Sequence, residues 1–340
     1  MRVLVTGSAG FIGRRLVRAL AAGGHVVAGL DKHETSESAG AEYVCDILDA
    51  DSLTRAVRDF APDAVVHLAA RTDLDGVALE GYAANIDGVS NLVEAVRSTP
   101  SVRRCIWTSS QLVCRVGYVP RHPLDYQPDT LYGRSKVKTE EIVRASDGGG
   151  REWTLVRPTT IWGPGVGPHY QRLLRMIRAG HYFHVGRAPL MKSYGYVDNV
   201  VYQYGRLLEA PRSAVHGSMF FLADYEPIDL IAWCNGLQAA FGAPRIRTLP
   251  RAVAAWLARG GDLLNVVGFR TFPLNSFRLN NVLTEYRFDL SATQAVCGPL
   301  PFTMQQGIEQ TVSWFEGLEK NRPHHADEGF RPRPTMPLGP

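Results

Sequence analysis

The sequence predicts an α/β fold, a doubly wound parallel sheet covered by helices on both faces and followed by a smaller C-terminal lobe. Two observations predict it. Short β-branched runs alternate with helical stretches through the first half of the 340 residues, which is typical of parallel sheets with helical crossovers. After Pro158 the Gly- and Pro-containing loops lengthen and the helical patterns become irregular, which indicates a second lobe.

The expected elements alternate in chain order. Strands are expected at residues 3–5, 25–30, 43–44, 64–67, 104–108 and 154–156, and helices near 11–22, 51–60, 79–96 and 132–145. A composition of 45% hydrophobic and 21% charged residues fits a globular chain with a sizeable core. Residues 321–340 are rich in proline and poor in apolar side chains, so a disordered tail is expected there, although His324 and His325 could bind a metal.

Charge and hydropathy exclude two classes of protein. The formal net charge is +4, and Lys and Arg are scattered along the sequence, so no nucleic-acid binding is expected. The longest apolar region, residues 252–269, is interrupted by Arg259, Gly260, Gly261 and Asp262. It is therefore expected to be a core or interface helix pair and not a membrane span.

The cysteines indicate a reducing compartment. Cys45, Cys105, Cys114, Cys234 and Cys297 are odd in number and include no C-x-x-C pair, so most are expected to be reduced and buried. The first apolar run is too short for a signal peptide. A cytoplasmic protein is expected.

The segment LVTGSAGFIGRRL, residues 4–16, places three glycines between the first strand and the first helix. Gly7 would form the tight turn, Gly10 would leave room for a pyrophosphate at the free helix amides, and Gly13 would let the helix approach the sheet. The spacing is G-x-x-G-x-x-G, a variant of the dinucleotide-binding fingerprint. A plain strand–helix turn would explain three glycines alone equally well.

Two acidic residues extend this hypothesis. Asp31 ends the second strand, where a carboxylate binds both ribose hydroxyls and repels a 2′-phosphate, so NAD is favoured over NADP. The alternative for Asp31 is a turn residue. Asp46 follows the third strand and could bind the adenine amino group, or it could cap the next helix.

A second motif, YGRSK, places Tyr132 and Lys136 on one face of a helix. The lysine cation and an oxidised nicotinamide ring would lower the phenol pKa from its usual value near 10. Tyr132 could then exchange a proton with a substrate hydroxyl. Ser110, at the carboxyl end of the fifth strand, could donate a hydrogen bond to the same oxygen, or it could simply form a turn.

Together these motifs resemble the extended short-chain dehydrogenase/reductase superfamily and, within it, the NAD-dependent nucleotide-sugar epimerase/dehydratase family. The resemblance covers about residues 1–318. Its motifs are TGSAGFIG, HLAA (residues 67–70), Asn85 with Gly88, TSSQLV, YGRSK, LVRPTTIWGPG (residues 155–165) and YGYVDNV (residues 194–200).

The resemblance implies a Rossmann-type NAD-binding domain in residues 1–165, joined by parts of 194–223, and a mainly substrate-binding lobe in residues 166–320. Catalytic roles are implied for Ser110, Tyr132 and Lys136. The NAD-binding residues would be Gly7, Gly10, Phe11, Ile12, Gly13, Asp31, Asp46, Ile47, Leu68, Ala69, Ala70, Asn85, Thr108, Tyr132, Lys136, Pro158 and Ile161. The substrate-binding residues would be Arg71, Thr72, Ser110, Thr160, Lys192 and Arg278. No metal site is implied.

In this family the tyrosine removes a hydroxyl proton, the adjacent carbon gives its hydride to NAD, and a keto sugar forms. An epimerase then returns the hydride to the other face of the ketone. Residues 111–113, directly after Ser110, contain no carboxylate, which argues against dehydration. Asp31 argues against NADPH-dependent reduction. The expectation is therefore a C4 epimerase for a nucleotide-diphosphate sugar, acting in surface polysaccharide synthesis, with Lys192 and Arg278 as candidate diphosphate anchors.

Two rivals stay open. Thr160 and Cys114 replace an Asn and a Tyr that are common in the epimerases, and RPTTIWGPG also resembles the hydroxysteroid dehydrogenase branch. The first rival is accordingly an NAD(P)-dependent dehydrogenase or reductase of the 3β-hydroxysteroid or nucleotide-sugar 4-reductase type. The second is a non-catalytic dinucleotide-binding protein. By family analogy a homodimer is expected, formed by the helices near 79–96 and 132–145.

Overall fold

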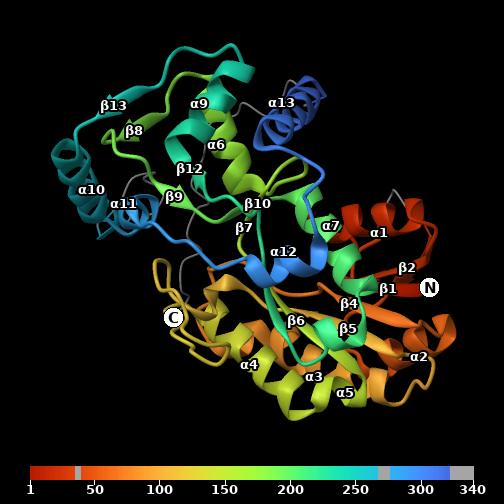
Figure 1. Cartoon of the computed structure of the whole chain (residues 1–340). Coiled ribbons are helices and arrows are strands. Elements are labelled where there is room, and N and C mark those ends of the chain that lie inside the picture. The colour runs from red at the N-terminus through yellow and green to blue at the C-terminus, as the bar shows by residue number, and fades with distance from the viewer. Residues whose placement is uncertain (35–39, 267–275, 322–340) are drawn as a thin grey trace, which may run out of the picture.

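The computed structural model describes residues 1–34, 40–266 and 276–321. Its central feature is a seven-stranded parallel sheet in the order β11-β6-β5-β4-β1-β2-β3 (Figure 1). The strands are β1 (Arg2–Thr6), β2 (Val26–Asp31), β3 (Ala41–Val44), β4 (Ala64–His67), β5 (Arg104–Thr108), β6 (Glu152–Pro158) and β11 (Met219–Leu222). The predicted doubly wound parallel sheet is confirmed.

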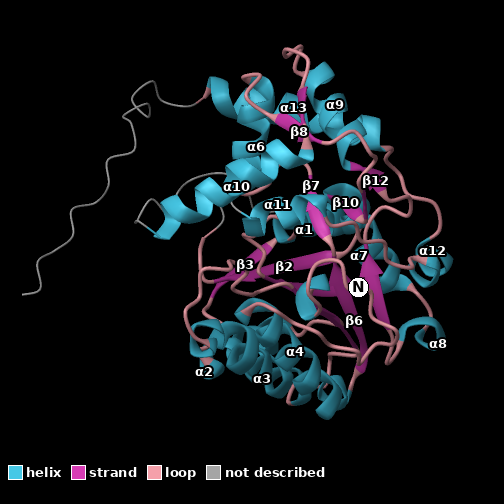
Figure 2. Cartoon of the chain, turned by 90° about the vertical axis from the view of Figure 1, so that its left-hand side faces the viewer, coloured by secondary structure: helices cyan, strands magenta, loops and turns pink. Residues whose placement is uncertain are grey.

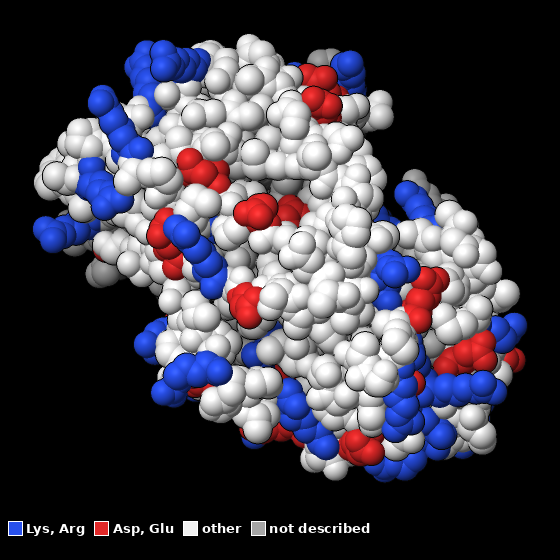
Figure 3. Space-filling model, in the orientation of Figure 1, with Lys and Arg blue, Asp and Glu red and all other residues white. Residues whose placement is uncertain are grey.

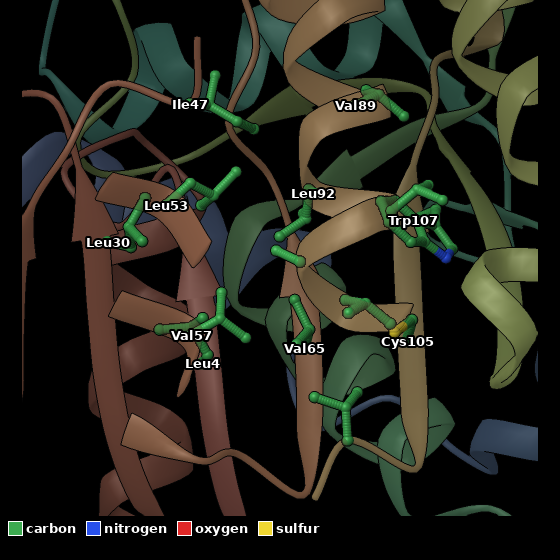
Figure 4. Packing of buried hydrophobic residues seen from close by; sticks show 14 of the residues in the cluster. Leu4, Leu30, Ile47, Leu53, Val57, Val65, Val89, Leu92, Cys105 and Trp107 are labelled. Atoms are coloured by element: carbon green, nitrogen blue, oxygen red, sulfur yellow. The ribbon is translucent and has the colours of Figure 1, made fainter. Parts of the chain in front are cut away.

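Helices cover both faces of this sheet (Figures 1 and 2). One face packs on α1 (Gly13–Ala22), α7 (Val197–Glu209) and α12 (Ser291–Cys297). The other packs on α2 (Ala50–Phe60), α3 (Ala83–Arg97) and α4 (Leu131–Ala145), with short α5 (Asp147–Gly150) beside them. Figure 4 shows this second core, where Leu4 and Val65 of the sheet meet Leu53, Val57 and Leu92 of the helices.

The chain winds first to β3 and then returns to β4, which pairs with β1 on its other side. The strand order therefore reverses between β1 and β4. In open parallel sheets a ligand crevice lies at this reversal, outside the carboxyl ends of the strands. The segments that follow β1, β4 and β5 are thus placed to form one site.

The second lobe has its own aromatic core, which includes Trp162, Trp233 and Phe315. Short strands β7 (Thr160–Trp162) and β10 (Tyr194–Tyr196) lead into it from the sheet. Its remaining elements are α6 (Pro168–Arg178), β8 (Phe183–Val185), β9 (Met191–Lys192), β12 (Ile228–Asp229), α9 (Leu230–Ala240), β13 (Arg247–Leu249), α10 (Arg251–Val266), α11 (Ser276–Leu283) and α13 (Met304–Lys320). The short helix α8 (Arg212–Val215) belongs to the sheet domain, where it packs beside β6.

Two expectations about helices need revision. The expected helix near 79–96 begins as a 3-10 turn, η1 (Leu79–Tyr82), before α3. The apolar region from residue 252 is one helix, α10, and not a pair. Gly260 and Gly261 do not break it, because buried Ala254 and Ala258 pack with Val185 and Leu279 and outweigh the low helix propensity of glycine.

Three further sequence predictions concern the cysteines, membrane spans and the ends of the apolar region and of the chain. All five cysteines are free and buried. None of the helices in the described part of the chain is long and apolar enough to cross a membrane. Residues 267–269 of the apolar region and residues 322–340 of the expected tail, with His324 and His325, lie outside the described residues.

Candidate active site

The glycine loop after β1 is built by close backbone approach. Gly7 has φ +72°, and a Cβ there would lie 2.6 Å from the amide nitrogen of Ala69. A Cβ at Gly13 would lie 2.1 Å from the carbonyl oxygen of Gly7, so only glycine lets α1 start this near the strand. Within the described part of the chain no side chain caps the first turn of α1, and that turn contains no acidic residue. The loop therefore fits a pyrophosphate at a helix amino end.

Asp31 lies beside this loop, at the carboxyl end of β2. Its carboxylate accepts hydrogen bonds from the amides of Ala9 and His33, each at 3.1 Å. This fixes the acid at the edge of the glycine loop, where the fingerprint places the ribose.

The segment after β3 shows which residue caps α2, one of the two roles considered for Asp46. Asp49, not Asp46, caps α2 by accepting a hydrogen bond from the amide of Ser52 at 3.0 Å. The exposed carboxylate of Asp46 accepts from the amide of Leu48. Ile47 is buried, and a Cβ added at Gly88 would lie 2.7 Å from it, so this segment packs on α3.

The segment after β4 is tied to the helix that carries Tyr132. Fully buried Asn85 accepts a hydrogen bond from the amide of Arg71 (2.8 Å) and donates to the carbonyl of Arg71 (2.9 Å) and to Ser135 Oγ (2.8 Å). The amides of Leu68 and Ala69 donate to Thr6 Oγ1. Ala70 lies half-buried in this segment and Thr72 is exposed. Asn85 therefore holds the expected cofactor loop against α4.

The expected catalytic residues come together at the carboxyl end of β5. Tyr132 and Lys136 are both buried in α4, and the Ser110 hydroxyl, which accepts a hydrogen bond from the Leu112 amide at 3.1 Å, lies close enough to the Tyr132 phenol to oppose the rise of its pKa. Lys136 Nζ donates to the carbonyl oxygen of Thr108 at 2.9 Å. A Cβ at Gly133 would lie 2.1 Å from the carbonyl oxygen of Leu112, so glycine allows α4 to press against the segment after Ser110.

The electrostatics of the pair differ from the expectation. Burial raises the pKa of Tyr132 to about 12, and the hydrogen bond from Ser110 opposes this only in part. Burial lowers the pKa of Lys136 to about 8, against the favourable charge of Glu140. The lowered phenol pKa expected from Lys136 is therefore not found in the protein alone, because the cost of a buried phenolate dominates. At neutral pH the phenol holds its proton.

Beneath the site, α4 is fixed to β6 by a fully buried ion pair. Arg157 donates from Nε and Nη2 to the two carboxylate oxygens of Glu140 at 2.7 and 2.8 Å. Tyr126 also donates to Glu140 at 2.9 Å. Glu140 lies two helical turns after Tyr132, so the pair sets the position of the helix that carries the phenol.

Two tyrosines at the site, Tyr82 and Tyr204, are not among the residues predicted from the sequence. The ring of Tyr82 packs 6.3 Å from that of Tyr132, and its hydroxyl donates to the carbonyl of Asp73. The hydroxyl of Tyr204, on α7, hydrogen bonds to Thr108 Oγ1 at 2.9 Å. No motif or spacing in the sequence marks either residue, since both reach the site only through the packing of distant segments.

Other residues expected to bind the cofactor line the junction of the two lobes. Pro158 ends β6, and Ile161 lies in β7. Phe11, Ile12 and Ile161 pack against the aromatic core of the second lobe. The glycine loop is thus in contact with both lobes.

The residues expected to bind substrate lie in different environments. Thr160 Oγ1 hydrogen bonds to Gln111 Nε2 (3.3 Å) and to Tyr286 Oη (3.0 Å), and Gln111 directly follows Ser110. Arg71 donates to Asp73 and to the carbonyl of Gly81. The side chain of Arg278, on α11, lies outside the described residues.

Lys192 is 2% exposed, and two of the three N–H donors of its ammonium are engaged within the protein. Nζ donates to the carbonyl oxygens of Asn281 and Thr284, each at 2.8 Å, and lies 5.0 Å from the centre of the Tyr286 ring. Burial lowers its pKa to about 8. Lys192 therefore ties β9 to the segment around α11.

Two histidines of the second lobe are not among the residues that gather around Tyr132. His184 lies buried in β8 and hydrogen bonds to Asn235 Oδ1, whereas His181 is exposed on the loop before that strand. No cluster of His, Cys, Asp and Glu among the described residues could hold a metal ion.

Comparison with known families adds an independent observation. The model of the NAD dependent epimerase/dehydratase family matches residues 3–223, well over half of the chain. The chain belongs to this family. The predicted family is therefore confirmed, and with it an enzyme whose cofactor is NAD.

Two relatives of this chain carry different named activities. The chain is 30% identical to a 3 beta-hydroxysteroid dehydrogenase/Delta 5-->4-isomerase of Mycobacterium tuberculosis, over 93% of this chain and 91% of that protein. It is 26% identical to the N-acetyl-alpha-D-glucosaminyl-diphospho-ditrans,octacis-undecaprenol 4-epimerase of Escherichia coli O157:H7, over 92% and 94% of the two chains.

A solved structure shares the fold. The UDP-glucose 4-epimerase of Thermotoga maritima has a TM-score of 0.73 at 21% identity, covering 94% of this chain and all of the other. The Rossmann-type sheet with its second lobe is thus the fold of both proteins.

Proposed function

We propose that this family member interconverts a secondary alcohol and a ketone on a largely apolar substrate, as a dehydrogenase of the hydroxysteroid type. One observation carries the proposal. Lys192, the candidate diphosphate anchor whose side chain the structure describes, is buried and already donates to two backbone carbonyls. A nucleotide diphosphate needs cationic donors that are free to reach it. The relative in Mycobacterium tuberculosis supports this substrate class.

In the reduction direction, the protonated phenol of Tyr132 donates its proton to the ketone oxygen while the carbonyl carbon receives a hydride. Ser110 is placed to hydrogen bond to the same oxygen, because its hydroxyl lies close enough to the phenol to lower the phenol pKa. Lys136, held by the carbonyl of Thr108, keeps a positive charge next to the phenolate that remains. In the oxidation direction, Tyr132 must first lose its proton. The nicotinamide of bound NAD supplies or accepts the hydride.

We assign the cofactor to the residues named from the sequence. Gly7, Gly10 and the amino end of α1 would bind the pyrophosphate, and Asp31 the adenosine ribose. The segments at Asp46 and Ile47 and at residues 68–70 would border the adenine and the dinucleotide. Thr108, Tyr132, Lys136, Pro158 and Ile161 would surround the nicotinamide end. The domain limits proposed are residues 1–165 with parts of 194–223 for NAD, and mainly 166–320 for substrate.

A second candidate is C4 epimerisation of a nucleotide-linked or lipid-linked sugar, in the synthesis of a surface polysaccharide. The Escherichia coli relative favours it, since it aligns along nearly the whole chain. The first half-reaction would be the same oxidation, and Tyr132 would return its proton after the ketone has turned over. A homodimer through α3 and α4 and a cytoplasmic location belong to this proposal by family analogy.

The experiment that separates the two is an activity screen with nicotinamide absorbance and product analysis. A 3β-hydroxysteroid with NAD, a ketosteroid with NADH, and UDP-, GDP-, CDP- and dTDP-sugars with NAD are each incubated with the protein. Steady conversion of NAD with a steroid supports the dehydrogenase. Inversion at C4 with no net change in NADH supports the epimerase. If the Tyr132→Phe variant matches the wild type on every substrate, the proposed chemistry is wrong.

A further inference from the structure

The second lobe contains two long segments without acidic residues. Residues 166–197 and 230–261 hold no Asp or Glu, although the chain has 33 of them, and together they hold nine Arg and Lys. With a net charge of only +4 over the whole chain, the positive charge is concentrated in this lobe. More than thirty residues separate the two segments in the sequence, so Lys and Arg are scattered along the chain although the fold can bring them together.

The fold brings the two segments together at one edge of the lobe. β13 pairs in parallel with β8, with Arg247 opposite Phe183 and Leu249 opposite Val185. A Cβ added at Gly186 would lie 3.0 Å from Arg251 Nε, at the start of α10. Five exposed arginines lie on these elements and the loops beside them; we call them the arginine face: Arg187, Arg245, Arg247, Arg251 and Arg259. Figure 3 shows blue side chains along this edge, over β13, β8 and α10 of Figure 1.

Helix α10 presents large apolar side chains to solvent beside the arginine face. Trp256 is 73% exposed and Val253 is 43% exposed, whereas Ala254 and Ala258 on the opposite side are fully buried. A helix that only stabilised the lobe would bury its tryptophan and expose its alanines. An exposed tryptophan with arginines on either side of it in the helix matches the composition of membrane-interface helices.

A cavity opens within the same edge. It has a volume of about 730 Å³ and is lined by Gly180, Pro244, Arg245, Ile246, Arg247 and Thr248. Two of its lining residues belong to the arginine face, and Arg guanidinium groups bind phosphate oxygens in pairs of hydrogen bonds. The cavity therefore offers room for an anionic headgroup beside an apolar helix.

We propose that this edge of the second lobe binds the surface of an anionic lipid bilayer. Trp256 and Val253 enter the boundary between headgroups and acyl chains, and the arginine face contacts the phosphates. A second copy of the chain fits the edge less well, because a twofold contact would set five arginines against five. A nucleic acid would not use the exposed apolar side of α10. Membrane binding does not depend on the proposed reaction, but it would bring the enzyme to apolar substrates.

The test is co-sedimentation of the purified full chain with vesicles of phosphatidylcholine alone or of phosphatidylcholine with phosphatidylglycerol. We expect binding to the mixed vesicles at low salt, little binding to phosphatidylcholine, and loss of binding as salt screens the charges. The variant R245Q/R247Q/R251Q should weaken binding by roughly tenfold to a hundredfold. Trp256→Ser should weaken it while leaving its salt dependence unchanged.

The matched control is R58Q/R103Q/R212Q, which removes three exposed arginines from the sheet domain. It should bind vesicles like the wild type. Turnover of a water-soluble ketone should be unchanged in all these variants, so a loss of vesicle binding and a loss of the proposed chemistry are separately visible. Absence of binding to the mixed vesicles, or equal loss in the control, overturns the proposal. A Trp256→Ser variant that keeps its vesicle binding and changes only its oligomeric state also overturns the proposal. The same holds for an arginine variant that keeps its vesicle binding and loses only RNA binding.

Discussion

The buried ammonium of Lys136 should make the enzyme less stable than a variant that lacks it. The residue is 1% exposed, and burial lowers its pKa from 10.5 to about 8. This corresponds to about 3 kcal/mol by which folding disfavours the charged amine relative to the neutral one. The Lys136→Met variant removes that cost with little change in volume.

The gain is partly offset. Methionine loses the hydrogen bond from Nζ to the carbonyl of Thr108, which contributes about 1 kcal/mol or somewhat more. We therefore expect Lys136→Met to be about 1–2 kcal/mol more stable than the wild type at pH 7, and to have lost most of its activity.

The pH dependence identifies the cause. Because the folded pKa lies below the unfolded one, the unfolded chain binds more protons between about pH 8 and pH 10.5. The stability contributed by Lys136 is present above pH 10.5 and is lost as the pH falls through 8. The advantage of Lys136→Met should accordingly be constant below pH 8 and disappear toward pH 10.5.

Urea unfolding followed by tryptophan fluorescence, at pH 7 and near pH 10, measures this difference. Lys138→Met is the matched control, since Lys138 lies two residues further along the same helix, is exposed and pairs with Glu141. It should show no comparable pH-dependent gain. A Lys136→Met variant that is less stable than the wild type at pH 7, by an amount that does not change with pH, would show that the buried charge of Lys136 does not destabilise the fold.

Three further predictions follow from the site. Tyr132→Phe should lower turnover by at least about a hundredfold, because the proton donor is lost, with NAD affinity by fluorescence titration nearly unchanged; near-normal turnover contradicts the role. Since burial raises the pKa of Tyr132 to about 12, the phenol is protonated below that value. Initial rates should therefore rise with pH for alcohol oxidation and not for ketone reduction, and parallel profiles in both directions would argue for another proton donor. Asp31→Ala should reduce the ratio of NAD to NADP efficiency in steady-state kinetics, and an unchanged ratio would mean that another group excludes the 2′-phosphate.

The last prediction concerns Tyr82, whose ring packs on that of Tyr132 and whose hydroxyl is held by the carbonyl of Asp73. Tyr82→Leu should lower kcat several-fold, and Tyr82→Phe, which keeps the ring, should restore most of it. Thermal unfolding of both variants shows whether the loss reflects folding; equal kcat in the leucine and phenylalanine variants would remove Tyr82 from the catalytic geometry.

The sheet, the glycine loop and the grouping of Ser110, Tyr132 and Lys136 could be predicted from the amino-acid sequence. These depend on local rules. Strands and helices follow from side-chain periodicity, a glycine is needed where backbones nearly touch, and residues four apart on a helix share a face. Asp31 could be placed for the same reason, since it ends a strand next to that loop.

The surroundings of these residues could not be predicted, because they depend on how distant segments pack together. Burial, which raises the pKa of Tyr132 and lowers that of Lys136, depends on every element that covers the site. Lys192 has the position expected of an anchor, yet its amine meets two carbonyls from a segment about ninety residues later. The arginine face likewise joins two stretches that are far apart in the chain. Spacing along a sequence specifies neighbours within one element, whereas charge, exposure and long-range contacts exist only once the elements have packed.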